Sequence, residues 1–238
     1  MSWGSRFTSR VQGKALSGIL IELFLIFVGV LAALAVENFR QLAQEKRAEQ
    51  VYLLGFRDAI RADTAMIKSE IQRCYLKLKA SSELLKLADS RQVASEEEFE
   101  EMITLVIMLI NPTYETAIYE ELKASGNIQI VSSEELRNAI ISYYVLVDRT
   151  NEFYMASITE FGYNELFTDL IDTEEFALER PFSQTVIIDR LRKSQEGKRY
   201  LQRLQKRIIT LHNSLFYTQL PRAHDLLDKL NRELGASD

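Results

Sequence analysis

The residue types that most often bind metals are few in this chain and far apart. His212 and His224 are the two histidines, twelve positions from each other, and Cys74 is the one cysteine. Metal sites gather such ligands at short spacings, as in His-x-x-x-His or Glu-x-x-His, and neither pattern occurs. A lone cysteine cannot form an internal disulfide, so we expect Cys74 to be a small buried apolar residue. The sequence therefore predicts no metal site and no cofactor.

Motifs for nucleotide binding and nucleophilic catalysis are also missing. The sequence contains no Gly-rich loop of the GxxxxGK or GxGxxG type and no Gly-x-Ser-x-Gly turn that would present a nucleophile. Carboxylate pairs such as Glu120-Glu121 and Glu134-Glu135 occur, but acidic residues are so frequent on the predicted helices that a pair does not indicate an acid and a base. We therefore expect a protein that is not an enzyme.

Two charged segments suit binding better than catalysis. Residues 96–101 are mostly glutamate, and a basic stretch begins at Arg190. Both can be solvated helix faces; alternatively they pair with each other in an oligomer, or the basic stretch contacts anionic lipid headgroups. The formal net charge of −5 gives no overall attraction to nucleic acid, so no nucleic-acid partner is expected. The residues of the candidate basic interaction face are Arg192, Lys193, Arg199, Arg203, Lys206 and Arg207.

The composition indicates which elements carry these residues. The 238 residues are 47% hydrophobic and 26% charged, which is typical of a folded protein. Only 9 glycines and 3 prolines are present to end elements, which favours long helices over many short strands. We predict an all-α fold in which one N-terminal transmembrane helix continues into a helical bundle domain.

A long apolar stretch predicts the transmembrane helix. Residues 15–36 contain one charged side chain, Glu22, and a helix of this length spans about 33 Å, enough for a hydrocarbon core of about 30 Å. A core helix of a soluble protein is rarely apolar on every face for so long. The predicted organisation is a basic tail at 1–14, a transmembrane helix at 15–37 and a helical soluble domain at 38–238.

A secretory signal peptide is the other explanation of this stretch. Lys14 precedes it, and Ala33-Leu34-Ala35 has the small residues of a cleavage site. The apolar run is longer than the core of a usual signal peptide, which favours an uncleaved anchor.

Three residues of the span are candidates for contact with a neighbouring transmembrane helix. Glu22 is ionisable, and such a group in hydrocarbon costs on the order of 2.5 kcal/mol or more unless it is paired or protonated. It lies about 10 Å from the start of the span, so it can also reach the headgroups. Gly29 and Ala33 are small enough to let a second helix approach closely, although no GxxxG motif occurs. The expected partners are membrane lipid and a protein in the membrane or a second copy.

Beyond the span, apolar residues recur at helical spacing. The first helix runs on to about Leu87. Ser95 and Glu98 have the spacing of a capping box, which predicts a helix start, and Pro112 ends or bends that helix. The span from Ile103 to Ile110 is too short for a second membrane pass.

The middle of the chain predicts two more helices. One covers 113–124 and stops at Gly126, which can take a left-handed cap conformation, and 128–131 is briefly extended. A second capping box at Ser132–Glu135 opens a helix that continues toward Ile171. Aromatic residues are dense here, and at helical spacing they are more often core than ligand pocket.

The C-terminal part predicts the partner of the first helix. Pro181 marks a break, and from about Lys198 leucine and isoleucine recur at three- and four-residue steps through Leu215. This helix fits lengthwise against 51–87, with a bend at Pro221, and an antiparallel bundle results.

Three stretches carry a family resemblance and cover the first two-thirds of the chain. The first is the span, with Glu22, Gly29, Leu31, Ala33 and Asn38, and with Phe39 where the family tends to have Trp. The second runs from Tyr52-Leu53 through Phe56 to Asp63. The third comprises Glu121–Gly126, Glu135–Ile140 and Tyr143-Tyr144. In these stretches the sequence resembles an uncharacterised bacterial family of single-pass membrane proteins, a domain of unknown function. The resemblance implies a membrane-anchored helical domain and brings no activity, cofactor or catalytic residue.

The flanks of the span give the expected orientation. Arg6, Arg10 and Lys14 precede it without an acidic residue, and Arg40, Lys46 and Arg47 follow it, so basic residues lie on both sides and the bias is small. We expect a single-pass protein of the bacterial inner membrane, with a cytoplasmic N-terminus and a periplasmic C-terminal domain. The predicted function is a non-enzymatic scaffold or accessory subunit of a membrane protein assembly. The alternative is a membrane-tethered, sensor-like or ligand-binding helical module.

Overall fold

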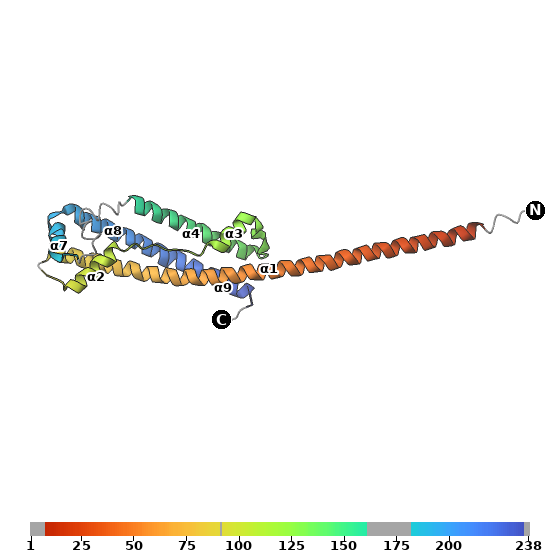
Figure 1. The fold of residues 1–238 in the computed structure, drawn as a ribbon, viewed down its shortest axis with the longest axis horizontal. Helices are drawn as coiled ribbons and strands as arrows, with labels where there is room; N and C mark the ends of the chain where they lie inside the picture. Colours follow the sequence, from red (N-terminus) through yellow and green to blue (C-terminus); the bar gives the residue numbers. More distant parts are fainter. Residues whose placement is uncertain (1–7, 91, 161–181, 236–238) are drawn as a thin grey trace, which may run out of the picture. The chain divides into compact units, whose positions relative to one another are not determined.

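The computed structural model describes the backbone of residues 8–90, 92–160 and 182–235, and the side chains of 22–90, 92–156 and 182–235. These ranges are helical and contain no strand, so the all-α prediction is confirmed. The elements, labelled in Figure 1, are α1 (Thr8–Asp89), α2 (Glu96–Ile107), α3 (Ala117–Ser125), the 3-10 helix η1 (Asn127–Ile130), α4 (Glu134–Glu160), α7 (Gln184–Lys193), α8 (Gln195–Ser214), the π-helical segment η2 (Leu215–Gln219) and α9 (Leu220–Glu233).

The chain divides into two compact units, Met1–Val51 and Tyr52–Asp238, and α1 contributes residues to both. In the first unit the large apolar side chains from Leu23 to Phe39 are exposed, with exposed fractions between 44% and 75%. This stretch is long and apolar enough to cross a membrane. The length and apolar composition of this helix confirm the sequence prediction of one candidate membrane-spanning helix near the N-terminus.

In the second unit, α1 buries residues at alternating steps of three and four. The buried side chains form two series, each with a spacing of seven residues, as in the seam of a coiled coil. One series is Phe56, Asp63, Glu70, Lys77 and Leu84, and the other is Leu53, Ile60, Ile67, Cys74, Ser81 and Ala88. The prediction that Cys74 is buried is therefore confirmed.

Helix α8 lies antiparallel along α1. Gln205 Nε2 donates to the Oγ atoms of Ser81 and Ser82, at 3.2 and 3.1 Å, and the earlier residue Lys198 pairs with the later residue Asp89. The predicted lengthwise packing of the last helix on the first is confirmed, and Figure 1 shows the two helices side by side within the bundle.

Helix α4 closes the bundle on another side. It is antiparallel to α9, because Lys229 Nζ lies 3.7 Å from Glu135 Oε1 while Gln219 Nε2 donates to Thr150 Oγ1 over 2.6 Å. The long helices α1, α4 and α8–α9 thus enclose one apolar core. Most of the aromatic residues described on α3 and α4 belong to it, as predicted, although Phe153 is 48% exposed.

Capping residues set several helix ends. Ser95 and Glu98 form the predicted capping box at the start of α2, and Gly126 ends α3 with φ of 70°. The second capping box is wrong in detail: α4 starts at Glu134, and Ser133 Oγ accepts from the amide of Leu136 over 3.3 Å. A leucine at that position cannot return the hydrogen bond, so only half of the box forms.

The structure differs from the predicted elements in three places. Residues 113–116 are not helical, since α3 begins at Ala117, and 128–131 lies mostly in η1 rather than in an extended segment. Helix α7 is not predicted from the sequence. The predicted break at Pro181 and the part of the predicted α4 helix beyond Glu160 lie outside the described residues.

Candidate functional site: a polar row in the bundle core

Helix α1 buries three charged residues at a spacing of seven, and we call Asp63, Glu70 and Lys77 the polar row. Their exposed fractions are 1%, 4% and 3%. Seven residues are close to two helical turns, so the three side chains project from one stripe of the helix. Charged residues are almost never this buried unless they are paired, which makes the row a candidate site.

Asp63 is held by two donors from different elements. The amide of Glu115 donates to Oδ1 over 2.8 Å, and the hydroxyl of Tyr143 donates to Oδ2 over 2.7 Å. Burial raises the pKa of the Asp63 carboxyl, while these two hydrogen bonds favour its ionised form and oppose the increase. Asp63 therefore ties the segment before α3 and the middle of α4 to α1.

The tyrosines around Asp63 act as hydrogen-bond donors. Burial, together with the nearby Asp63 charge, raises the pKa of Tyr114, Tyr143 and Tyr144. Tyr144 donates to the carbonyl of Glu115 over 3.0 Å and stacks on Tyr119 with ring centroids 4.3 Å apart. All three phenols thus stay protonated at neutral pH.

The π-helical segment η2 places Gln219 beside this cluster. Gln219 Oε1 accepts from the Tyr114 hydroxyl, and its Nε2 donates to Thr150 Oγ1, which in turn donates to the Leu146 carbonyl over 3.0 Å. The side chain is 1% exposed and both ends of its amide are paired. π-helical turns are uncommon and are often found at functional sites.

Lys77 lies at the other end of the polar row. Its Nζ donates to the carbonyl of Met108, over 2.5 Å, directly after the last residue of α2. A positive charge there satisfies a free carbonyl and is stabilised by the helix dipole. Burial lowers the pKa of Lys77 to about 8, so the group is mostly protonated at pH 7.

Glu70 occupies the middle of the row and is incompletely paired. Its Oε1 accepts from Arg73 Nη1 over 2.7 Å, whereas its buried Oε2 has no hydrogen-bond partner within the described residues. Leaving one buried acceptor unpaired costs about 1–3 kcal/mol. Glu70 therefore carries a desolvation cost that its ion pair with Arg73 offsets only in part.

The groups beside the row do not include an activated nucleophile. Burial, with a smaller contribution from the Glu70 charge, raises the pKa of the Cys74 thiol to about 12, so the reactive thiolate is scarce at neutral pH. In the residues that the structure describes, no three His, Cys, Asp or Glu side chains gather in a way that could hold a metal ion. The row is best suited to holding chain segments in place.

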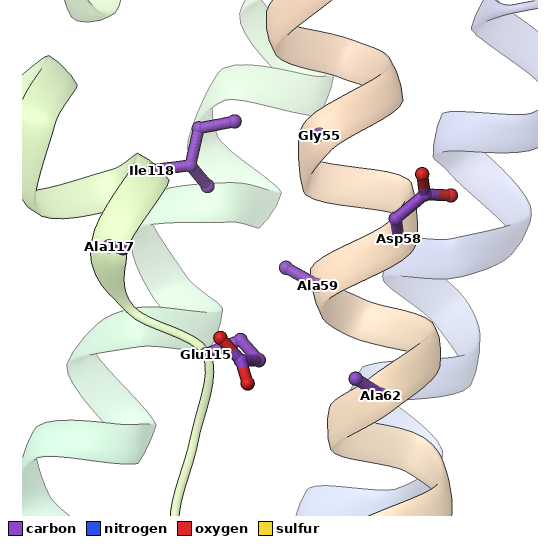
Figure 2. A pocket seen from close by; sticks show the side chains of 7 residues that line it. All are labelled: Gly55, Asp58, Ala59, Ala62, Glu115, Ala117 and Ile118. Carbon is purple, nitrogen blue, oxygen red and sulfur yellow. The ribbon is translucent and has the colours of Figure 1, made fainter.

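A shallow hollow of about 310 Å³ lies on the surface near Asp63. Its walls are mostly small residues because Gly55, Ala59 and Ala62 of α1 face Ala117 and Ile118 of α3, as Figure 2 shows. Close packing explains the glycine: a Cβ on Gly55 would lie 2.2 Å from Ile118 Cδ1. The carboxylates at the hollow are those of Asp58 and Glu115.

The candidates for transmembrane contact lie along α1 in the first unit. The Glu22, Gly29 and Ala33 positions are exposed. A Cβ on Gly29 would meet no atom within 4 Å, so the described chain gives no packing reason for glycine there. A glycine within a helix costs about 1 kcal/mol relative to alanine. Contact of these residues with a neighbouring helix stays a prediction.

The predicted basic face separates into two groups. Arg192 is exposed but tied to the bundle: its guanidinium donates to the carbonyls of Leu87, Ala88 and Ser90 at the end of α1. Lys193 is exposed and pairs with Asp189 one turn earlier over 2.5 Å, and Arg207 is partly buried. Arg199, Arg203 and Lys206 are exposed on α8 at steps of four and three. These three residues form a solvent-facing basic stripe on α8.

The polar row was not predicted from the sequence. Asp63, Glu70 and Lys77 were visible as polar residues at core positions of an apolar repeat, and this was the available signal. Tyr143 and the Glu115 amide, which bond Asp63, and the Met108 carbonyl, which bonds Lys77, lie 31 to 80 residues away in sequence, so no local pattern predicts the pairing.

Comparison of the chain with protein-family models, with curated proteins and with solved structures found no match. The resemblance to a family of single-pass membrane proteins stays a prediction.

Proposed function

We propose that this chain is a non-enzymatic, membrane-anchored scaffold or accessory subunit of a membrane protein assembly. The observation that carries the proposal is the exposed apolar surface of α1 from Leu23 to Phe39. Apolar surface in water costs about 25 cal/mol per Å², so a helix of this kind is stable in lipid and not in solution.

The bundle supplies the interaction surfaces in this proposal. Arg199, Arg203 and Lys206 form an exposed basic stripe, and Phe216 and Tyr217 are exposed farther along the same helical stretch. Arginine and aromatic side chains are enriched where proteins bind one another. A protein partner in the membrane assembly, or a second copy, is the proposed occupant.

The proposed location is the bacterial inner membrane, with the N-terminus in the cytoplasm and the bundle in the periplasm. The basic residues before the span support this orientation. A reporter enzyme that is active only in the periplasm, fused after Asp238, tests it. Activity supports the proposed orientation, and an inactive but intact fusion reverses it.

The assembly role is tested by photo-crosslinking in intact membranes. A photoreactive residue at Gly29 or Ala33 lies on one stripe of the helix, and the same residue at Leu31 lies on the opposite face and is the matched control. We expect crosslinks to one defined protein from positions 29 and 33 and not from 31. Lipid adducts alone from all three positions, or recovery of the chain in the supernatant after carbonate washing, would contradict the proposal.

A ligand-binding helical module is the second candidate, because the hollow beside Gly55 is walled by small side chains and bordered by two carboxylates. A thermal-shift screen on the full chain in detergent tests it. A compound that stabilises the wild type but not the Ala62→Leu variant, in which a larger side chain fills the hollow, supports this candidate.

A further inference from the structure

An extended segment joins α2 to α3 along the surface of α1, and we call residues 108–116 the strap. Its side chains alternate: Ile110, Pro112 and Tyr114 are buried, while Asn111 and Thr113 between them are exposed. This alternation is the pattern of an extended chain with one face on a core.

The strap is attached to the polar row at both ends. Lys77 Nζ binds the Met108 carbonyl over 2.5 Å, and Asp63 Oδ1 accepts from the Glu115 amide over 2.8 Å. The fourteen residues of α1 between Asp63 and Lys77 rise about 21 Å, and the seven extended residues from Met108 to Glu115 span about 23 Å. The two lengths agree, so the strap follows the row and its middle lies beside Glu70.

Between these two attachments the strap has few polar contacts. Within the described part of the chain, no amide from Leu109 to Tyr114 donates a hydrogen bond, and Pro112 has no amide hydrogen. The remaining polar anchors are the Tyr114 hydroxyl, bonded to Gln219, and the Glu115 carbonyl, which accepts from the Tyr144 hydroxyl over 3.0 Å. Besides its buried apolar side chains, the strap therefore depends on a small number of side-chain bonds.

Glu70 works against closure of the strap. Among the residues that the structure describes, its buried Oε2 has no hydrogen-bond partner, and Glu70 lies midway along α1 between the two attachments. Water that enters when the strap lifts would hydrate this carboxylate, so opening relieves a cost that the closed form carries. The row thus combines two groups that hold the strap with one group that favours its release.

We propose that the strap is a releasable latch, which opens from α1 while α1, α4 and α8–α9 stay packed. Asp63 and Lys77 hold the strap on α1, and the desolvation cost of Glu70 lowers the free energy needed to open it. Opening exposes the polar row to water. The proposal concerns the Tyr52–Asp238 unit and does not depend on the membrane anchor.

Two cysteine reporters distinguish latch opening from unfolding. Ile110 is 5% exposed, so a thiol in Ile110→Cys, made in a Cys74→Ala background, becomes reactive when the strap lifts. The native Cys74 in the wild type is buried in α1 and reports on opening of the bundle. Labelling of the full chain in detergent by a maleimide is measured for both and corrected for the reactivity of each thiol in urea. We expect the strap thiol to react roughly tenfold faster or more.

The polar row is then altered in each reporter background. Lys77→Met should accelerate strap labelling roughly fivefold. Glu70→Met should slow it by a similar factor, because it removes the buried oxygen Oε2, which has no hydrogen-bond donor among the described residues. Glu83→Met is the matched control, since Glu83 makes the same i,i+3 pair with Lys86 but on the surface, and it should change neither rate. Circular dichroism confirms that each variant is folded.

Three results would overturn the proposal. Equal corrected rates for the two thiols would show that the strap leaves only when the bundle unfolds. Faster strap labelling in Glu70→Met would show that Glu70 helps to close the segment. Equal acceleration of both reporters by Lys77→Met would make Lys77 a general stabiliser of the bundle and not part of a latch.

Discussion

Tyr143 and Asp63 are 80 residues apart in sequence, and the hydroxyl of the first donates to Oδ2 of the second over 2.7 Å in the bundle core. This bond joins α4 to α1, and about two turns farther along α4 the Thr150 hydroxyl accepts from Gln219 of η2 over 2.6 Å. Polar contacts inside the apolar core therefore join α4 both to α1 and to the α8–α9 stretch. Such contacts favour a single packing arrangement, since sliding a helix would leave buried groups unpaired.

Replacing Tyr143 by phenylalanine is expected to destabilise the bundle. The variant leaves the buried Oδ2 of Asp63 without its donor, and the cost should be about 1–3 kcal/mol of unfolding free energy. Urea unfolding of the full chain in detergent, followed by circular dichroism, measures it. Tyr217→Phe is the control, because Tyr217 is 71% exposed and its change should lie within about 0.5 kcal/mol. Equal stability of the two variants would contradict the prediction.

Asp63 should also give the bundle a defined pH dependence. Its folded pKa is raised, so the folded state holds a proton that the unfolded state releases, and stability falls as pH rises from about 3.9 through the folded pKa. The Asp63→Asn variant should lack this contribution. Unfolding free energies measured between pH 3 and 8 test it against Asp58→Asn, an exposed carboxylate. Identical pH profiles of the two variants would refute the assignment.

Lys77 should make the free energy of unfolding rise with pH in the alkaline range, the opposite of the effect expected from Asp63. Its folded pKa of about 8 lies below the ordinary value of about 10.4, so the unfolded state binds more protons in this window and stability rises with pH. Cys74, with a folded pKa of about 12, lowers stability over an overlapping range, so the measurement belongs in a Cys74→Ala background. In that background the unfolding free energy should rise with pH by an amount on the order of 1–3 kcal/mol. Lys77→Met should abolish this rise, and Lys79→Met, at an exposed position, should leave it unchanged.

The helices and their caps were predictable because their signals are local. The Ser95 box, the Gly126 stop and the apolar repeat of α1 are patterns within a few turns, and the structure follows them. The shift of α4 from Ser132 to Ser133 has a local cause as well: two adjacent serines compete to be the cap, and sequence spacing does not decide between them.

The candidate site was not predictable to the same degree. Glu70 and Lys77 read as ordinary charged positions of a helix unless the apolar repeat is followed through them. The strap looked helical up to Pro112 and again beyond it, but its extended form is set by attachments to Asp63 and Lys77, far away in the chain. The basic face was predicted only in part, because the exposed Arg192 is tied to carbonyls at the end of α1, a contact that its local sequence does not indicate.

Arg192 should therefore matter for stability and not for surface binding. Its guanidinium donates to three carbonyls at the end of α1, the shortest bond being 2.5 Å to Ser90. Arg192→Met should lower the unfolding free energy by about 1–3 kcal/mol, and Arg192→Lys should recover only part of it, since lysine lacks the forked geometry. Arg199→Met on the exposed stripe is the control in the same urea experiment. A neutral Arg192→Met would mean that water replaces the guanidinium at no cost.

The spacing of the buried residues explains the π-helical turn before α9. Buried residues follow steps of three and four up to Leu215 and continue from Gln219 with the series displaced by one residue. The turn absorbs that residue, because the amide of Leu220 bonds the carbonyl of Leu215, five positions back. It also stands directly before Pro221, which has no amide hydrogen and would crowd the preceding turn of a regular α-helix.

Deleting the exposed Thr218 separates these two causes. The deletion removes the extra residue, so a regular α-helix would carry the apolar series without a shift, but Pro221 would then sit in a helix interior at a cost of about 3 kcal/mol or more. We expect the deletion alone to lower the melting temperature of the full chain in detergent, and the deletion with Pro221→Ala to restore most of it. Pro221→Ala alone should keep the π-helical turn, since the register still requires it. If the deletion is equally harmful with alanine and with proline, the extra residue serves the position of Gln219 rather than the accommodation of Pro221.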